Sequence, residues 1–147
     1  RDILKRPPRD PKEPILGRPQ WLAIVLYGST LTAATFGALA LAHLGFGLDH
    51  QATVTVTFLT LAFSQLWHVF NMRHQSSRLV LNEVSRNPWI WAALALCACI
   101  LLAAAYVPSL AFMLHVIAPD MRMWGIIFAM SAVPLLAGPV IRYIVRQ

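Results

Sequence analysis

One uncharged segment, Thr53–Asn71, limits what this chain can fold into more than any other. At roughly 19 residues it is long enough to cross the hydrocarbon core of a bilayer as a helix. Its polar residues recur at steps of three and four, which places them on one side of that helix. They are Thr53, Thr57, Thr60, Ser64, His68 and Asn71, with Gln65 at the edge of the stripe. The opposite side is apolar: Val54, Val56, Phe58, Leu61, Ala62, Val69 and Phe70.

The polar stripe indicates where this helix should face. Hydrocarbon cannot hydrogen-bond hydroxyls, an amide or an imidazole, so the stripe should turn toward protein or trapped water. We therefore interpret Thr53–Asn71 as the functional wall of a small membrane bundle.

Three further runs qualify as membrane spans by length and hydrophobicity: Trp21–Leu44, Pro88–Val107 and Trp124–Ile144. Only 12% of the residues are charged, whereas soluble domains carry about 25%. The sequence therefore predicts an all-α membrane protein with four transmembrane helices in a bundle, and leaves no room for a soluble catalytic domain. Pro134 and Pro139 should bend the last span, because each removes a backbone donor.

The basic residues flank the predicted spans in an asymmetric way. They precede the first span, lie between the second and third, and close the chain: Arg1, Lys5, Arg6, Arg9, Lys12, Arg18, Arg73, Arg78, Arg86, Arg142 and Arg146. The loop after the first span has no Lys or Arg, and the loop after the third has Arg122 alone. The positive-inside rule then predicts that both termini are cytoplasmic. A nucleic-acid partner is not expected, since these charges mark span ends rather than a soluble basic face.

The first 20 residues form a separate proline-rich, basic segment. Five prolines forbid a continuous helix and favour extended backbone. We expect 1–20 to be a cytoplasmic strap docked on a protein surface and 21–147 to be the four-helix transmembrane domain. Because the chain begins with Arg and shows no signal-peptide pattern, we also expect it to be a piece of a longer protein.

Two smaller predictions concern packing. Ser29, Ala33 and Gly37, spaced by four, predict a small-residue ridge on the first span that lets another helix approach closely. The stretch Ser109–Met123 is too short and too polar to span, so its apolar stripe should lie along the outer surface.

Three stretches resemble a known family. The string Asp2-Ile3-Leu4-Lys5-Arg6-Pro7-Pro8-Arg9-Asp10-Pro11-Lys12-Glu13-Pro14-Ile15 is similar to the cytoplasmic loop after the sixth membrane helix of type II P-type cation-transporting ATPases, calcium pumps among them. The core Ser64–Asn71 and the Asn87-Pro88-Trp89 step follow in matching order and spacing. The resemblance covers essentially the whole chain and identifies it as the seventh to tenth membrane helices of such a pump, its C-terminal support domain.

The resemblance carries functional expectations. The parent enzyme would use ATP and Mg²⁺, hydrolyse ATP through an aspartyl phosphate and move a cation across a membrane. Its partners would be the remaining membrane helices, the cytoplasmic domains, the bilayer and the transported cation. Gln65, with Ser64 and His68 beside it, would contribute to the edge of the cation site, and Gln65 would be the metal ligand. The segment Arg6, Pro7, Pro8 and Arg9 would couple phosphorylation to the membrane helices. The expected location is the plasma (inner) membrane of a prokaryote.

Alternative readings stay open at the level of the residues. Gln65 could be an amide hydrogen-bonded between helices, and His68 a neutral packing histidine or a proton relay. The chain could also be a free-standing, non-enzymatic scaffold or regulatory module, or a small oligomeric transporter. The spans hold no Asp, Glu or Lys, which is unusual for a self-sufficient proton-coupled exporter. The chain also lacks the phosphorylated DKTGT motif, so it is not expected to be catalytic by itself.

Overall fold

The computed structural model describes residues 17–72 and 87–145, and every regular element in those ranges is helical. In order they are α1 (Arg18–Ala40), the π-helical turn η2 (Leu41–Gly45), α2 (His50–His68), the 3₁₀ turn η3 (Val69–Met72), α3 (Pro88–Tyr106), α4 (Pro108–Leu114), α5 (Met121–Ser131) and α6 (Val133–Val145). The coupling residues Arg6, Pro7, Pro8 and Arg9 lie outside the described residues. The expected all-α class is confirmed for the described part of the chain.

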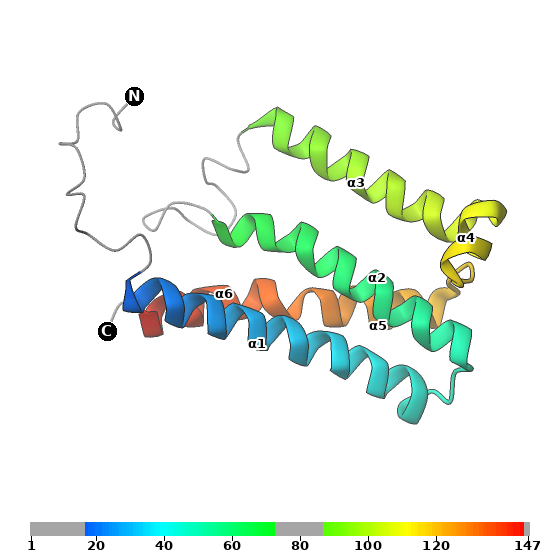
Figure 1. Cartoon of the computed structure of the whole chain (residues 1–147), viewed down its shortest axis with the longest axis horizontal. Helices are drawn as coiled ribbons and strands as arrows, with labels where there is room; N and C mark the ends of the chain where they lie inside the picture. The colour runs from blue at the N-terminus through cyan, green and yellow to red at the C-terminus, as the bar shows by residue number, and fades with distance from the viewer. Residues whose placement is uncertain (1–16, 73–86, 146–147) are drawn as a thin grey trace.

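The axes of the long helices are roughly aligned, and α1 and α2 run in opposite directions, as Figure 1 shows. Helix α2 packs against α1 and α5, while α1 also packs along α6. Helix α3 lies farther out and packs mainly against α2 and α4, with a 3.1 Å hydrogen bond from the Trp124 indole N–H of α5 to the Tyr106 hydroxyl and a ring contact between Phe70 of η3 and Trp91. The chain enters α1 and α3 and leaves α2 and α6 at one end of the bundle (Figure 1). The connections at η2 and α4 lie at the opposite end.

Side-chain caps fix where several helices begin. Asp49 accepts a hydrogen bond from the Ala52 backbone N–H at 2.9 Å and so starts α2. Asp120 starts α5 in the same way, with 2.8 Å to the Met123 N–H. Such caps satisfy amides that have no partner inside the helix, which matters most near an apolar environment. Both carboxylates therefore have a structural role at the η2 end of the bundle.

Helix α2 is the central element, because it is covered on two sides. Leu59, Val56 and Phe63 pack against Ile127 and Met123 of α5 to form the core. Val56 was expected on the outward apolar side, and this expectation is wrong. The spacing of polar residues identifies the polar side of this helix. It does not show that α5 also covers the neighbouring side, which carries Val56.

The small-residue ridge of α1 lies one residue away from its expected position. Ser29 and Ala33 are exposed, whereas Ala34, Ala38 and Ala42 are buried. Gly37 is close to the Met130 side chain of α5, so this one member of the expected ridge does face a neighbouring helix. The prediction that small residues allow close approach is therefore confirmed for Gly37, whereas at Ser29 and Ala33 it stays a prediction, because no described helix covers them. The buried alanines make equivalent space for α2 and α5.

Among the described residues, three helical stretches are long and apolar enough to cross a membrane: Arg18–Gly45, Pro88–Tyr106 and Met121–Val145. They correspond to the expected first, third and fourth spans. Helix α2 is not among them, because its threonines, Ser64, Gln65 and His68 lower its hydropathy. The four-span count therefore stays a prediction. The last span is interrupted at Ala132, between α5 and α6 and two residues before Pro134, as the prolines predict.

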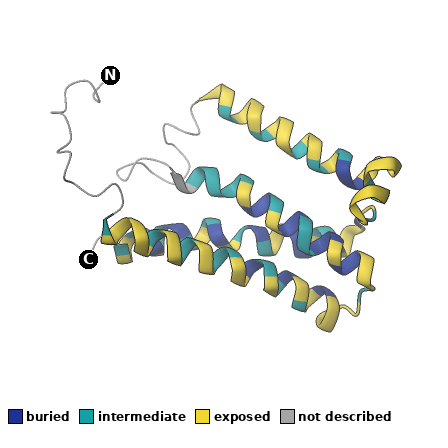
Figure 2. Ribbon diagram, viewed as in Figure 1, coloured by how far each residue is buried: buried dark blue, intermediate teal, exposed yellow. Residues whose placement is uncertain are grey.

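The outer surface of the bundle is apolar. Figure 2 shows long exposed strips on α1 and α3. In each of these two spans, only 11% of the most apolar 18-residue stretch is buried. Large side chains such as Phe36, Leu96 and Leu136 are exposed there. Helix α4 has no buried residue, so the first half of Ser109–Met123 does lie on the surface. An extended apolar exterior of this kind suits lipid or further membrane helices rather than water.

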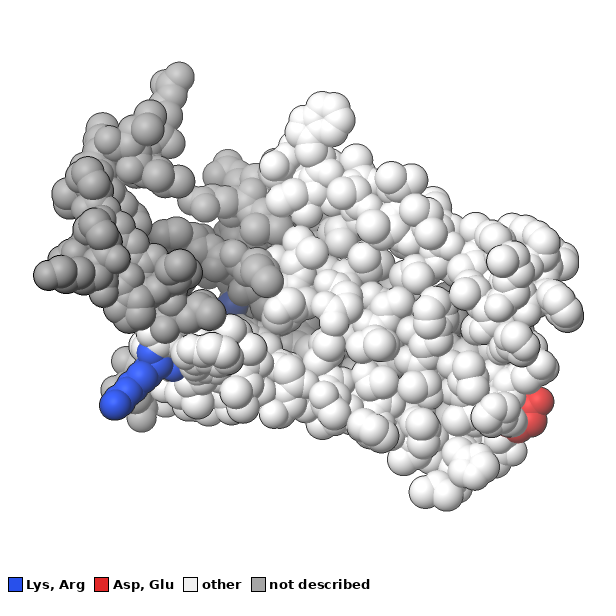
Figure 3. Space-filling view, in the orientation of Figure 1, with Lys and Arg blue, Asp and Glu red and all other residues white. Residues whose placement is uncertain are grey.

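The acidic side chains of the described residues lie at one end of the bundle, and the basic ones lie at both ends, with Arg122 of α5 next to the Asp120 cap. In Figure 3 the visible basic side chains lie at the end where α1 begins, and the acidic ones at the opposite end. Arg18 and Arg142 belong to elements that start or finish at the first end, while Asp49 and Asp120 cap helices at the second.

Candidate functional site between α1 and α2

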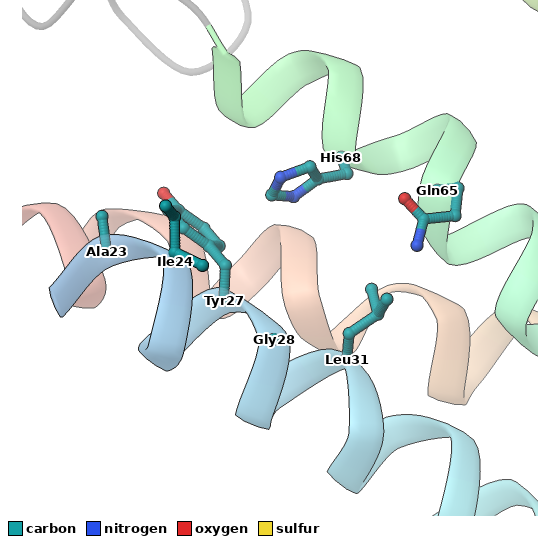
Figure 4. A pocket seen from close by; sticks show the side chains of 7 residues that line it. All are labelled: Ala23, Ile24, Tyr27, Gly28, Leu31, Gln65 and His68. Atoms are coloured by element: carbon teal, nitrogen blue, oxygen red, sulfur yellow. The ribbon is translucent and has the colours of Figure 1, made fainter. Parts of the chain in front are cut away.

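A cavity of about 420 Å³ opens between α1 and α2 near the end where α1 begins. The α1 side is formed by Ala23, Ile24, Tyr27, Gly28 and Leu31, and the α2 side by Gln65 and His68. Figure 4 shows the side chains of Gln65 and His68 extending from α2 toward Leu31 and Tyr27. Two of the three sequence-predicted site residues therefore line the same cavity.

Tyr27 joins three helices at this cavity. Its ring meets the His68 imidazole edge to face, with the ring centroids 4.9 Å apart. Its hydroxyl donates a 3.4 Å hydrogen bond to the Gly138 carbonyl oxygen of α6. From sequence, Tyr27 reads as an interfacial aromatic residue near the start of a span, and only the tertiary contacts reveal its bridging position. No sequence signal distinguishes it from Trp21, which is exposed.

Ser64, the third predicted residue, lies one helical turn before His68 and does not line the cavity. It is fully buried, and so is Thr60 one turn earlier. The Ser64 and Thr60 hydroxyls and the His68 Nδ1 atom are shielded from solvent and have no hydrogen-bond partner among the described residues. Three polar atoms without a partner thus follow one line on α2. Buried polar groups are nearly always paired in native proteins, so this line indicates a missing partner or ordered water.

Gln65 is exposed within the open cavity and makes no hydrogen bond to any described residue. The interhelical amide bond that was the alternative reading is therefore absent between the described helices. Its carboxamide offers one oxygen acceptor and two N–H donors to whatever enters the cavity.

The described residues do not make a complete cation site. They include no group of three or more His, Cys, Asp or Glu side chains placed to hold a metal ion. The capping carboxylates Asp49 and Asp120 belong to the other end of the bundle. A hard cation prefers six to eight oxygen ligands, several of them charged. Gln65, Ser64 and Thr60 supply neutral oxygens only, so this face could form one edge of a site whose charged ligands come from elsewhere.

A second polar connection links α2 to the break in the last span. The Trp67 indole N–H donates to the Ser131 hydroxyl at 3.2 Å, and Ser131 donates in turn to the Phe128 carbonyl oxygen at 3.3 Å. Ser131 is fully buried where α5 ends. This relay fixes the orientation of α2 against the bend and thereby supports the cavity wall.

Comparison with known proteins agrees with this architecture. The family model described as cation-transporting ATPase, C-terminus, matches residues 1–144. The calcium-transporting ATPase of Bacillus subtilis (strain 168) is 31% identical over 139 residues, which cover 93% of this chain and 16% of that protein. Calcium-transporting ATPase 1 of Bacillus cereus (strain ATCC 10987 / NRS 248) is 29% identical over 88 residues, covering 60% of this chain and 10% of that protein. The chain thus spans only a small part of the length of these relatives.

Proposed function

Since this chain belongs to the family formed by the C-terminal membrane domains of P-type cation-transporting ATPases, we propose that it supports the transport helices of an ATP-driven pump. It is an integral membrane domain and part of a larger protein. The parent enzyme would hydrolyse ATP with Mg²⁺ through an aspartyl phosphate. Since both relatives above are named calcium-transporting ATPases, the proposed cation is Ca²⁺.

The observation that carries this proposal is the incomplete polar face of α2. Gln65 and His68 line an open cavity, and the line from His68 to Thr60 holds buried polar atoms with no described partner. Such a face lowers the energy of the protein only when it meets polar groups from another segment. We propose that upstream membrane helices of the pump meet the exposed Gln65 carboxamide and carry the charged cation ligands, while ordered water reaches the buried hydroxyls of Thr60 and Ser64. Gln65 would then be a neutral oxygen ligand at the edge of the site, beside Ser64 and His68.

Two further proposals concern the ends of the bundle. The end that holds Arg18 and Arg142 would face the cytoplasm, in keeping with the positive-inside rule. The segment 1–20 would contact the cytoplasmic domains through Arg6 and Arg9, which can pair with carboxylates or backbone carbonyls. The transmembrane part would be 21–147. The Bacillus relatives favour a prokaryotic plasma membrane.

The test uses the full-length pump and measures Ca²⁺-dependent ATP hydrolysis across a range of free Ca²⁺. Gln65→Ala should raise the Ca²⁺ concentration for half-maximal activity several-fold, because one oxygen ligand is lost. Leu61→Ala, on the same helix and 42% exposed, is the matched control and should leave that concentration unchanged. Equal Ca²⁺ dependence for Gln65→Ala and the unmodified pump would refute the ligand role.

A second measurement separates the pump from the alternative functions. Purified chain in liposomes should give no ion flux without the rest of the protein, whereas a small oligomeric transporter would. A free-standing scaffold would also give no flux, and the full-length protein would then show no Ca²⁺-dependent ATP hydrolysis.

A further inference from the structure

A second and larger cavity, of about 570 Å³, opens between α1 and α2 at the opposite end of the bundle. It is formed by the end of α1, the turn η2, the short connection that follows and the first three turns of α2. Its lining residues are Leu39, His43, Leu48, Asp49, His50, Thr53, Val54, Thr57 and Phe58. None of them belongs to the candidate cation site.

The chemistry of this cavity changes along the helix axes. Its ionisable residues, His43, Asp49 and His50, all lie at the helix ends. Its apolar residues Val54 and Phe58 follow deeper in α2. Phe58 lies eight residues after His50, which is about 12 Å along a helix. The cavity is therefore polar at the bundle end and apolar toward the membrane centre.

The two threonines in the wall do not add free polar groups. Thr53 donates its hydroxyl proton to the Leu48 carbonyl oxygen at 3.4 Å, and Thr57 donates to the Thr53 carbonyl oxygen at 2.8 Å. The deeper part of the cavity is thus apolar in practice, and the three ionisable side chains supply the polar chemistry.

Asp49 is the only lining residue with a formal charge at neutral pH, and Lys and Arg are absent from the lining. One carboxylate oxygen accepts the capping bond from the Ala52 N–H. A carboxylate offers further lone pairs, so Asp49 can also accept from a cationic group. The imidazoles of His43 and His50 provide N–H donors. The mouth therefore suits a ligand that carries an ammonium group beside a phosphate.

We propose that this cavity binds a phospholipid with an ammonium headgroup, of the phosphatidylethanolamine class, from the leaflet at the η2 end of the bundle. Its ammonium group pairs with Asp49, its phosphate accepts hydrogen bonds from His43 and His50, and an acyl chain lies along Val54 and Phe58. The single negative charge disfavours a purely anionic headgroup such as phosphatidylglycerol. This inference depends on the membrane location of the chain and is independent of the cation site at the other end.

Asp49→Asn tests the charge without disturbing the fold, because Asn caps a helix about as well as Asp. The matched control is Asp120→Asn. Asp120 caps α5 with the same geometry and does not line the cavity. The full-length protein that contains this chain is delipidated in detergent, and native mass spectrometry then compares retained phosphatidylethanolamine and phosphatidylglycerol with identical acyl chains.

The unmodified protein and Asp120→Asn should both prefer phosphatidylethanolamine. Asp49→Asn should retain about threefold to fivefold less of it, the factor expected for a partly exposed ion pair, and should lose the preference. A preference for phosphatidylglycerol, or unchanged retention in Asp49→Asn, would overturn the proposal.

A second probe keeps the test independent of that variant. A photoreactive benzoylphenylalanine introduced at Val54 in full-length protein should crosslink to lipid. Crosslinking to another segment of the same polypeptide would instead show that a protein helix fills the cavity, and the lipid proposal would fail.

Discussion

The Tyr27 hydroxyl in α1 lies 3.4 Å from the Gly138 carbonyl oxygen in α6. The two residues are 111 positions apart in sequence, so this contact connects the first and last helices of the chain. It also orients the Tyr27 ring against His68. The wall of the candidate site is thereby held by a helix that contributes no residue to the cavity lining.

Removing that hydroxyl should loosen the first and last helices. Tyr27→Phe keeps the ring contact with His68 and loses the hydrogen bond, so we expect a loss of about 0.6 kcal/mol, the average for such bonds between membrane helices. Thermal unfolding in detergent is the measurement. Tyr143→Phe, at an exposed position on α6, is the control. Equal effects of the two changes would contradict a specific role for the Tyr27 bond.

The Trp67–Ser131 pair should show measurable coupling. A double-mutant cycle with Trp67→Phe and Ser131→Ala isolates the 3.2 Å hydrogen bond from the loss of each side chain. We expect a coupling free energy of about 0.5–1.5 kcal/mol. Strictly additive effects on the free energy of unfolding would mean that this bond does not hold α2 against the bend.

The buried side of α2 should contribute far more to the free energy of unfolding than its exposed side. Leu59 is 1% exposed and Leu61, two residues later on the same helix, is 42% exposed. Leu59→Ala leaves a cavity between α2 and α5, and we expect it to cost about 2–3 kcal/mol. Leu61→Ala should cost well under 1 kcal/mol. Unfolding midpoints of the two variants, measured side by side, check this difference, and a reversed order would show that α2 is rotated.

The buried Ser64 hydroxyl should be dispensable for the stability of this domain taken alone. Because it has no described partner, Ser64→Ala loses no hydrogen bond and removes a desolvated polar group. We expect unchanged or slightly higher stability in the isolated domain and lower activity in the full-length pump. Ser131→Ala is the matched control, since Ser131 is equally buried but hydrogen-bonded. Clear destabilisation of the isolated domain by Ser64→Ala would reveal a partner within this chain.

The sequence by itself determined the class of this protein. Low charge and long apolar runs follow from local chemistry, so the helices and the three apolar spans could be predicted. The Asp49 and Asp120 caps were not predicted, and α2 and α5 begin three residues earlier than expected, at His50 and Met121. The break near Pro134 also follows from the chain alone, because a missing backbone donor is a local property. The polar stripe of α2 could be read from its period, which correctly placed Thr60 and Ser64 in the interior.

Only the tertiary structure decided which neighbours meet those faces. The spacing of residues along a helix defines its sides but does not show how many of them are covered. For this reason Val56 was assigned to the wrong side of α2, and the buried small residues of α1 are Ala34 and Ala38. Tyr27 and Ser131 have ordinary local surroundings, and their roles arise from helices more than 60 residues away in sequence. Long-range contacts depend on how whole helices pack together, and no local pattern in the chain specifies that.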